Sequence, residues 1–158
     1  MSCLTILTVP NPLLRKRAKE VEYVTDSERK LLADMAETMY MNGGCGLAAT
    51  QVGVDKRICI TDVGNGLVKL VNPIIVRKDG HDVLEEGCLS VPEFTIKVKR
   101  AKKVVVDYLN EYGEVSRITA EGMLARAIQH ELDHLSGRLI VDYLGPIKKL
   151  FLKKKKAK

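Results

Sequence analysis

The chain lacks several features that would assign it quickly to a class. It has no tryptophan and only seven aromatic residues, two phenylalanines and five tyrosines, in 158. A surface that binds nucleic acid by stacking rings on bases is therefore poorly supported. No stretch approaches the ~20 apolar residues of a membrane-spanning helix. With no low-complexity linker and no internal repeat, the length corresponds most simply to one domain.

A disulfide framework is also missing. The four cysteines include no C-x-x-C pair and no regular spacing. The N-terminal residues show no apolar segment of the secretory type. We therefore expect free thiols in a reducing compartment, with the bacterial cytoplasm as the first expectation and an organelle as the alternative.

Acidic residues are absent from the C-terminal end of the chain. No acid follows Asp142, and residues 148–158 contain seven lysines. Removing these lysines from the 26 basic residues leaves 19, against 20 acidic residues, so the net charge of +6 comes from a tail. We expect one catalytic domain over residues 1–147, with no clear basic face, and a basic tail over residues 148–158. The tail is either a solvated end or a contact for a polyanion.

Histidine is scarce, yet two of the three histidines lie in the segment His130-Glu131-Leu132-Asp133-His134. Residues four apart share one face of a helix, so His130 and His134 can bind one metal ion together. Glu131 can then take a proton from a water molecule that the metal activates. The alternative is an ordinary helix with two unrelated histidines.

A catalytic site of this kind normally has a third protein ligand. One peptidase pattern places that ligand downstream, at the position of Ile140, which cannot bind a metal. The only acid after His134 is Asp142. Unless Asp142 serves, the third ligand lies upstream.

The upstream candidates are His81 and the four cysteines. Cys3 is close to the N-terminus, and Cys59 lies in an apolar run that is typical of a buried strand. Cys45 and Cys88 are flanked by glycine. By position we favour Cys88 over Cys45 as a metal-bound thiolate, and each cysteine could instead be a small buried residue.

Hydrophobic periodicity predicts two main helices. A capping box that opens at Thr25 precedes apolar residues at helical spacing, which indicates a helix over residues 26–41. The second helix should cover residues 120–135, carry the two histidines and stop at Gly137. A short third helix is expected near residues 146–152.

The segment between the two helices has the pattern of strands. Turn residues separate two pairs of runs and favour hairpins. The expected strands are residues 58–63, 67–71, 94–99, 104–109 and 115–118. Because strict βαβ alternation is absent, we expect an α+β fold with mixed, mainly antiparallel sheets around a central helix that carries the H-E-x-x-H motif.

The glycine-rich segment Gly44-Cys45-Gly46-Leu47-Ala48-Ala49 matches the loose dinucleotide-binding pattern G-x-G-x-x-A. That pattern requires a preceding strand, whereas a helix is expected here, so we reject a dinucleotide site. We expect these glycines to let a backbone approach a ligand closely.

Three motifs occur together in one order: G-x-G-L-A-A-x-Q from Gly44 to Gln51, E-G-C-L-S from Glu86 to Ser90, and H-E-x-x-H from His130. In this combination the chain resembles peptide deformylases, which remove the formyl group from the N-terminal formylmethionine of new polypeptides. The resemblance extends over residues 9–144.

The resemblance implies roles for individual residues. The metal ligands would be Cys88, His130 and His134. Glu131 would be the general acid and base, while the Gln51 amide and the Leu89 N–H would hold the oxyanion. The metal would be Fe²⁺, with Zn²⁺, Ni²⁺ or Co²⁺ as possible substitutes.

A substrate-binding set is also expected. By the resemblance, Gly46 and Gly87 would contact the peptide backbone of an N-formylmethionyl substrate, with Cys45 and Glu86 in the same set. Cys45 stands where many family members carry an aliphatic residue. On the expected helix, a pocket for the methionine side chain would be lined by residues that share the face of His130. These are Met123, Arg126 and Ala127.

Two other functions compete with this interpretation. One is a metallopeptidase with the same helix, against which the missing downstream ligand argues. The other is a non-enzymatic ribosome- or RNA-binding protein, for which only the lysine tail argues. We expect neither membrane association nor sequence-specific recognition of nucleic acid.

Overall fold

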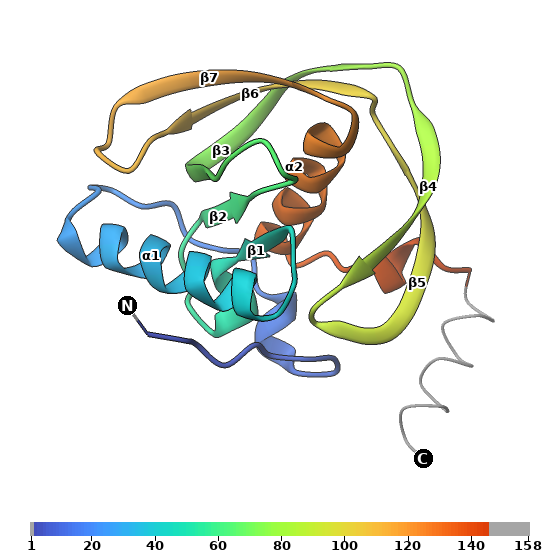
Figure 1. The fold of residues 1–158 in the computed structure, drawn as a ribbon, viewed down its shortest axis with the longest axis horizontal. Helices are drawn as coiled ribbons and strands as arrows, with labels where there is room; N and C mark the ends of the chain where they lie inside the picture. The colour runs from blue at the N-terminus through green and yellow to red at the C-terminus, as the bar shows by residue number, and fades with distance from the viewer. Residues whose placement is uncertain (1, 146–158) are drawn as a thin grey trace.

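The computed structural model describes residues 2–145 of the chain (Figure 1). Over this range it contains two α-helices, seven strands and three short 3-10 helices. The elements in chain order are η1 (Pro12–Arg15), α1 (Asp26–Met41), β1 (Gly46–Ala48), η2 (Ala49–Val52), β2 (Ile58–Thr61), β3 (Val68–Asp79), β4 (Asp82–Cys88), β5 (Val91–Arg100), β6 (Lys103–Leu109), β7 (Val115–Glu121), α2 (Gly122–Leu135) and η3 (Ile140–Tyr143).

Helix α1 has the predicted bounds. The hydroxyl of Thr25 accepts a hydrogen bond from the Ser27 N–H, and the Glu28 carboxylate accepts one from the Thr25 N–H, which completes the capping box. The buried face of α1 packs against β1 and β2 through residues such as Leu32 and Met39. The helix therefore covers the β1 edge of the sheet, which is formed by part of the glycine-rich segment.

One antiparallel sheet of five strands has the order β1-β2-β3-β6-β7. The two predicted hairpins are confirmed as the pairs β2–β3 and β6–β7. Strand β3 continues to Asp79, well beyond the predicted end at residue 71. The alternation is lost at Asn72, whose φ is +51°, and at Pro73, so the sequence pattern hides the second half of the strand.

A separate two-stranded sheet is formed by β4 and β5. Strand β5 contains the predicted residues 94–99. Strand β4 was not predicted, because most of its side chains are exposed and no buried face repeats with a period of two. Its last residue, Cys88, pairs with Val91 across the turn.

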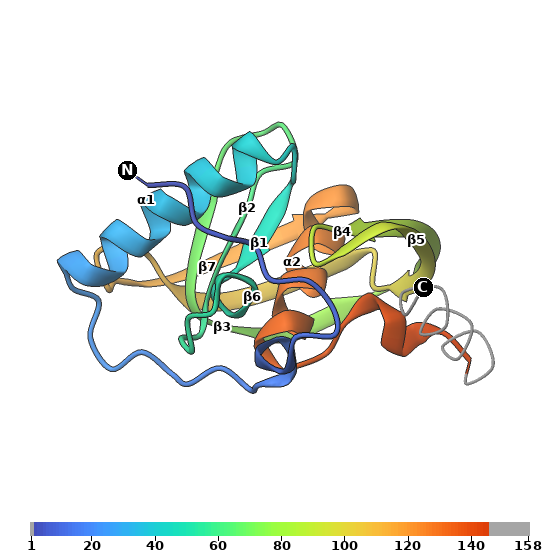
Figure 2. The ribbon, with the colours of Figure 1, turned by 90° about the horizontal axis from the view of Figure 1, so that it is seen from below.

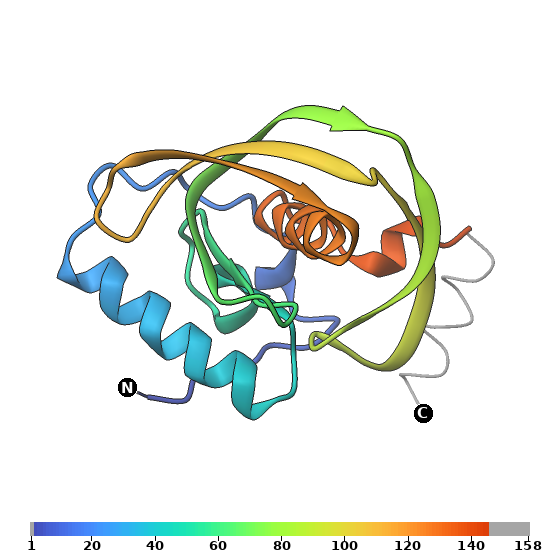
Figure 3. The ribbon, with the colours of Figure 1, turned by 45° about the horizontal axis from the view of Figure 1, so that its top comes forward.

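Helix α2 occupies the centre of the molecule, and the strands pass around it in the view of Figure 3. Helix α1 and the β4–β5 sheet lie on opposite sides of α2 (Figures 1 and 2). The helix begins at Gly122, two residues after the predicted start near residue 120, because Ala120 and Glu121 still pair with β6. The α+β class and the central helix are confirmed.

The end of α2 requires a glycine. Gly137 has a φ of +77°, and a Cβ atom there would lie 2.4 Å from the carbonyl oxygen of Arg15. The chain therefore turns under η1 and continues to η3. No helix within residues 2–145 is long and apolar enough to cross a membrane. The predicted helix at residues 146–152 lies outside the described residues, and the boundary at residue 147 stays a prediction.

Candidate metal and catalytic centre

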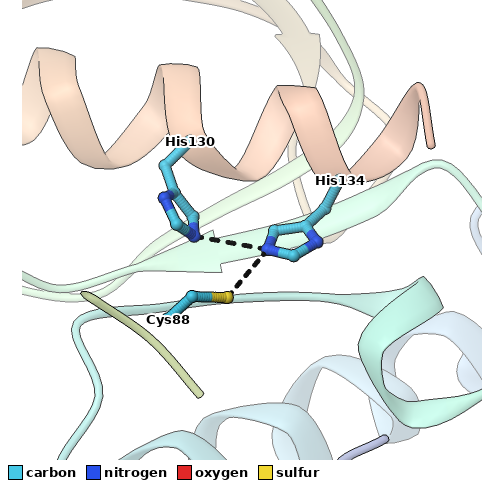
Figure 4. A group of neighbouring side chains, drawn as sticks. All are labelled: Cys88, His130 and His134. Atoms are coloured by element: carbon cyan, nitrogen blue, oxygen red, sulfur yellow. Dashed lines mark hydrogen bonds between the residues drawn. The ribbon is translucent and has the colours of Figure 1, made fainter. Parts of the chain in front are cut away.

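Three predicted metal ligands meet in space although they come from two distant segments. His130 and His134 project from one face of α2, and Cys88 approaches them from the end of β4 (Figure 4). The Nε2 atoms of the two histidines are 3.2 Å apart, and the Cys88 Sγ lies 3.3 Å from the His134 Nε2. All three ligand atoms lie within 4.8 Å of one another.

These separations fit a tetrahedral metal centre. With metal–nitrogen bonds of about 2.1 Å and a metal–sulfur bond of about 2.3 Å, ligand atoms at tetrahedral angles lie about 3.4–3.6 Å apart. The His130–His134 and Cys88–His134 separations are within a few tenths of an ångström of that range, and the third separation is at most 4.8 Å. Two imidazoles and one thiol form a donor set that suits Zn²⁺ or Fe²⁺ and leaves a fourth position for water.

The Glu86 carboxylate orients His130. Its Oε1 lies 3.0 Å from the His130 Nδ1, so the ring donates from Nδ1 and presents Nε2 to the centre. Arg100 binds both carboxylate oxygens of Glu86, at 2.9 and 3.0 Å. Burial alone would raise the pKa of Glu86, but hydrogen bonds from His130 and Arg100 hold it at about 2. The carboxylate is therefore charged and anchored.

Arg126 supplies a second cation to Glu86. Its guanidinium lies 2.5 Å from the Glu86 Oε2 and also donates to the Val98 carbonyl and to Asp82. These partners fix the guanidinium, which is buried. Arg126, which was predicted to line the methionine pocket, therefore also holds the Glu86 carboxylate that orients His130.

Asp133, the fourth residue of the H-E-L-D-H segment, extends this network. Its carboxylate accepts hydrogen bonds of 2.6 Å from Arg100 and from the Tyr143 hydroxyl. Arg100 thus joins α2, β4 and η3 at one point. The sequence analysis missed Arg100 and Tyr143, because no motif connects residues so far apart in the chain.

His134 is almost completely buried. Burial, aided by the nearby His130 and Arg100, lowers its pKa well below the usual value. The ring is therefore neutral, which is the form that coordinates a metal.

Glu131 lies beside the three ligand atoms. Its Oε1 is 3.8 Å from the His130 Nε2, and its buried Oε2 has no hydrogen-bond partner within residues 2–145. Burial raises the pKa of Glu131 to about 7. An unpaired carboxylate oxygen at a metal site is the arrangement that a proton acceptor for bound water requires.

Gly46 makes room for this carboxylate. A Cβ atom on Gly46 would lie 2.6 Å from the Glu131 Oε1, which is closer than such atoms can approach. Gly46 is held in β1 by its pairing with Thr61. The second glycine of the G-x-G-L-A-A-x-Q motif is thus explained by the position of the catalytic carboxylate.

Gln51 is anchored on both sides of its amide. The Gln51 Oε1 accepts a hydrogen bond of 2.9 Å from the Ala48 N–H, and its Nε2 donates one of 3.0 Å to the Ser90 hydroxyl. The same Nε2 lies 3.8 Å from the Cys88 Sγ. The amide nitrogen therefore faces the metal site and is preorganised as a donor.

A cavity of about 630 Å³ opens onto this centre. It is lined by the predicted catalytic residues Gln51, Leu89 and Glu131 and by every residue of the predicted substrate-binding set. That set is Cys45, Gly46, Glu86, Gly87, Met123, Arg126 and Ala127. The cavity is also lined by residues on the β5 side that the sequence analysis missed. Phe94 and Thr95 belong to this group, and their closeness to the E-G-C-L-S motif is the only sequence signal that could have indicated them.

The other ligand candidates are not part of this group of three ligand atoms. The Asp142 carboxylate forms an ion pair with Arg15 and accepts a hydrogen bond from the Leu139 N–H. Cys59 is buried in β2 as predicted, and all four cysteines are free thiols. Among the described residues, Cys88, His130 and His134 form the only group with metal-ligand spacing.

Comparisons with known proteins agree with this geometry. The family model of polypeptide deformylases matches residues 3–150. A peptide deformylase of Pseudoalteromonas translucida is 49% identical over 158 residues, which covers 98% of this chain and 95% of that protein. One of Halothermothrix orenii is 52% identical over 144 residues, covering 90% and 94%. The crystal structure of a peptide deformylase from Ehrlichia chaffeensis in complex with actinonin superposes with a TM-score of 0.95 at 43% identity, covering 98% and 96%.

Proposed function

The chain belongs to the polypeptide deformylase family, and we propose that the centre formed by Cys88, His130, His134 and Glu131 is its active site. The protein is a metal-dependent amidohydrolase that removes the N-terminal formyl group from nascent polypeptides. The observation that carries the assignment of the site is the tetrahedral spacing of three ligand atoms beside a buried carboxylate with an unpaired oxygen.

Cys88, His130 and His134 would hold the metal ion. The chemistry that a bound metal supplies is to acidify a water molecule and to polarise a carbonyl oxygen. Fe²⁺ is our proposal for the native ion, with Zn²⁺, Ni²⁺ and Co²⁺ as substitutes, because the sulfur and nitrogen donors accept all of them. Glu86 keeps the His130 Nε2 directed at the site throughout the reaction.

Glu131 moves the proton. Its unpaired oxygen takes a proton from the attacking water as the water oxygen bonds to the formyl carbon. The same carboxyl then gives that proton to the methionine nitrogen as the C–N bond breaks. The products are formate and a peptide with a free amino terminus.

Gln51 and Leu89 would stabilise the negative charge that develops on the formyl oxygen. The Gln51 Nε2 is fixed by its bond to Ser90, and the Leu89 N–H lies in the turn directly after Cys88. Donors of this kind are each worth about 10²–10³ in rate when they are positioned in advance.

The substrate would lie in the 630 Å³ cavity. Met123 and Ala127 offer apolar surface to a methionine side chain, and the fixed Arg126 limits its depth. Gly87 adds no side chain where the peptide backbone passes. Ala127→Trp should raise KM for formyl-Met peptides several-fold, because the ring would fill the pocket. An unchanged KM would refute this pocket.

We further propose that the enzyme works in the bacterial cytoplasm and that its lysine-rich tail, residues 148–158, contacts the ribosome. The relatives named above are bacterial, and nascent chains emerge from a polyanionic particle that attracts a cluster of lysines. Deleting residues 153–158 should weaken co-sedimentation with ribosomes at low salt; unchanged co-sedimentation would contradict the tail contact.

The decisive assay is formate release from formyl-Met-Ala-Ser, with unformylated Met-Ala-Ser as the matched control. Formate release that stops with a chelator and returns with Fe²⁺ added without oxygen supports the proposal. Release of amino acids from either peptide without formate would indicate a metallopeptidase instead. Glu131→Gln should keep its metal and lose turnover, which separates the proposed proton carrier from the ligands.

A further inference from the structure

A second cavity, of about 690 Å³, lies outside the substrate site and has no role in the proposed reaction. It is bordered by the second half of β3, the end of β5 and the C-terminal half of α2. Six cationic side chains and one carboxylate, Asp133, line it. The cations are Arg57, Arg77, Lys78, Lys99, Arg100 and Arg138.

Most of this positive charge is not neutralised within the protein. Arg100 is paired with Glu86 and Asp133, and Arg77 is paired with Asp79. The remaining four cations, Arg57, Lys78, Lys99 and Arg138, form no ion pair within residues 2–145. A concave surface with four unpaired cations is an anion-binding surface.

The clustering is stronger than the composition of the domain would give. Over residues 1–147 basic and acidic residues are almost equal, at 19 and 20. Without the six cations and the one carboxylate of the cavity, residues 1–147 contain 13 basic and 19 acidic residues. The expectation of no basic face outside the tail is therefore wrong, because four separate segments each bring one or two cations to the same place.

Two cations are held in position. The Arg57 guanidinium is partly buried and donates to the Pro73 carbonyl, and burial lowers its pKa. The Arg138 guanidinium stacks on the Tyr143 ring at 5.1 Å, while Arg100 stacks on the same ring at 5.1 Å. Fixed guanidinium groups suit phosphate oxygens, because their planar fork donates two hydrogen bonds at once.

We propose that this cavity binds the phosphate backbone of RNA. The charge complements a polyanion, and exposed Ile74 and Val76 at the rim offer apolar contact to sugars. A membrane surface is a poorer fit, because a flat layer of headgroups does not enter a concave site. The inference adds a surface to the proposed enzyme and does not rest on its catalytic roles.

The test compares two double variants of the full chain. In the cavity variant, Lys78→Gln is combined with Lys99→Gln; in the control variant, Lys16→Gln is combined with Lys97→Gln. All four lysines are exposed and form no ion pair within the described residues, and the control pair lies outside the cavity. The tail is present in both proteins, so its contribution to binding is the same. Formate release should be unchanged in both variants, which verifies the fold.

Binding to a short, labelled RNA duplex is measured across a salt series. Loss of two phosphate contacts should reduce the slope of log K against log salt by about 2 in the cavity variant, and affinity at 0.1 M salt by about 10- to 60-fold. The control variant should behave as the unmodified chain does. Equal behaviour of the two variants would overturn the proposal. So would a cavity variant that loses binding to phosphatidylserine vesicles but keeps its binding to RNA.

Discussion

Replacing Gly46 by alanine tests whether the position of one carboxylate limits the rate. The added Cβ would lie 2.6 Å from the Glu131 Oε1, 3.0 Å from its Cδ and 3.1 Å from its Cγ. An ordinary carbon–oxygen contact is about 3.3 Å or more, so one of the two groups must move by roughly 0.7 Å. Strand β1 is held by its antiparallel pairing with β2, in which Gly46 lies opposite Thr61. The carboxylate, whose Oε2 has no partner in the described part of the chain, is the group that moves.

Such a shift should lower kcat strongly. A displacement of about 1 Å at a catalytic group can cost about 10²-fold in rate, so we expect formate release by Gly46→Ala to fall by a factor of about 30–100. KM should change little, and metal content should stay at one ion per chain because Cys88, His130 and His134 are not touched. Gly145→Ala is the matched control, because a Cβ at that position meets no atom of residues 2–145 within 4 Å. A kcat within about threefold of the unmodified enzyme, or a fall explained by lost metal, would refute the reasoning.

Three further predictions concern the surroundings of the centre. Cys88→Ser should lose most bound metal and nearly all turnover, as measured by metal analysis and formate release; full metal occupancy with normal turnover would remove the basis of the assigned site. Glu86→Gln should weaken metal binding by about 10- to 100-fold in a competition with a chelator, because His130 loses its charged partner, whereas Glu85→Gln on the exposed face of β4 should not. Glu28, paired with Lys56 and hydrogen-bonded to Thr25, has a pKa lowered to about 2. Its stabilising effect should therefore be complete above about pH 5 and lost as the pH falls towards 2. Glu28→Gln should remove this dependence and about 1 kcal/mol from the free energy of unfolding at pH 7, as measured with urea at both pH values; an equal pH dependence in both proteins would contradict it.

Local signals in the sequence predicted those parts of the fold that depend on near neighbours. The capping box at Thr25 located the start of α1 to the residue, because its hydrogen bonds join residues three apart. The hairpins β2–β3 and β6–β7 followed from turn residues between apolar runs. Strand β4 was missed because its exposed side chains carry no period of two, and its partner β5 rather than its own pattern makes it a strand.

The candidate site was predictable to the extent that motifs carry it. The helix spacing of His130 and His134 follows from chemistry alone, whereas position in the sequence only favoured Cys88 over Cys45, and the resemblance to a family strengthened that choice. No pattern could indicate Arg100, because its partners Glu86, Asp133 and Tyr143 lie 14, 33 and 43 residues away. Contacts between residues so far apart in the sequence depend on the complete fold. The residues that orient a metal-binding histidine are therefore harder to predict than the histidine itself.

The buried ion pairs around Glu86 fix the carboxylate that orients the His130 ring. An isolated charge in the interior would be strongly unfavourable, yet Glu86 lies between two arginines and a histidine, and each arginine has a second carboxylate, Asp133 or Asp82. Charge is thus nearly balanced within the cluster, and removal of Glu86 would leave each arginine with a single carboxylate partner. Arg100 is also part of the wall of the basic cavity.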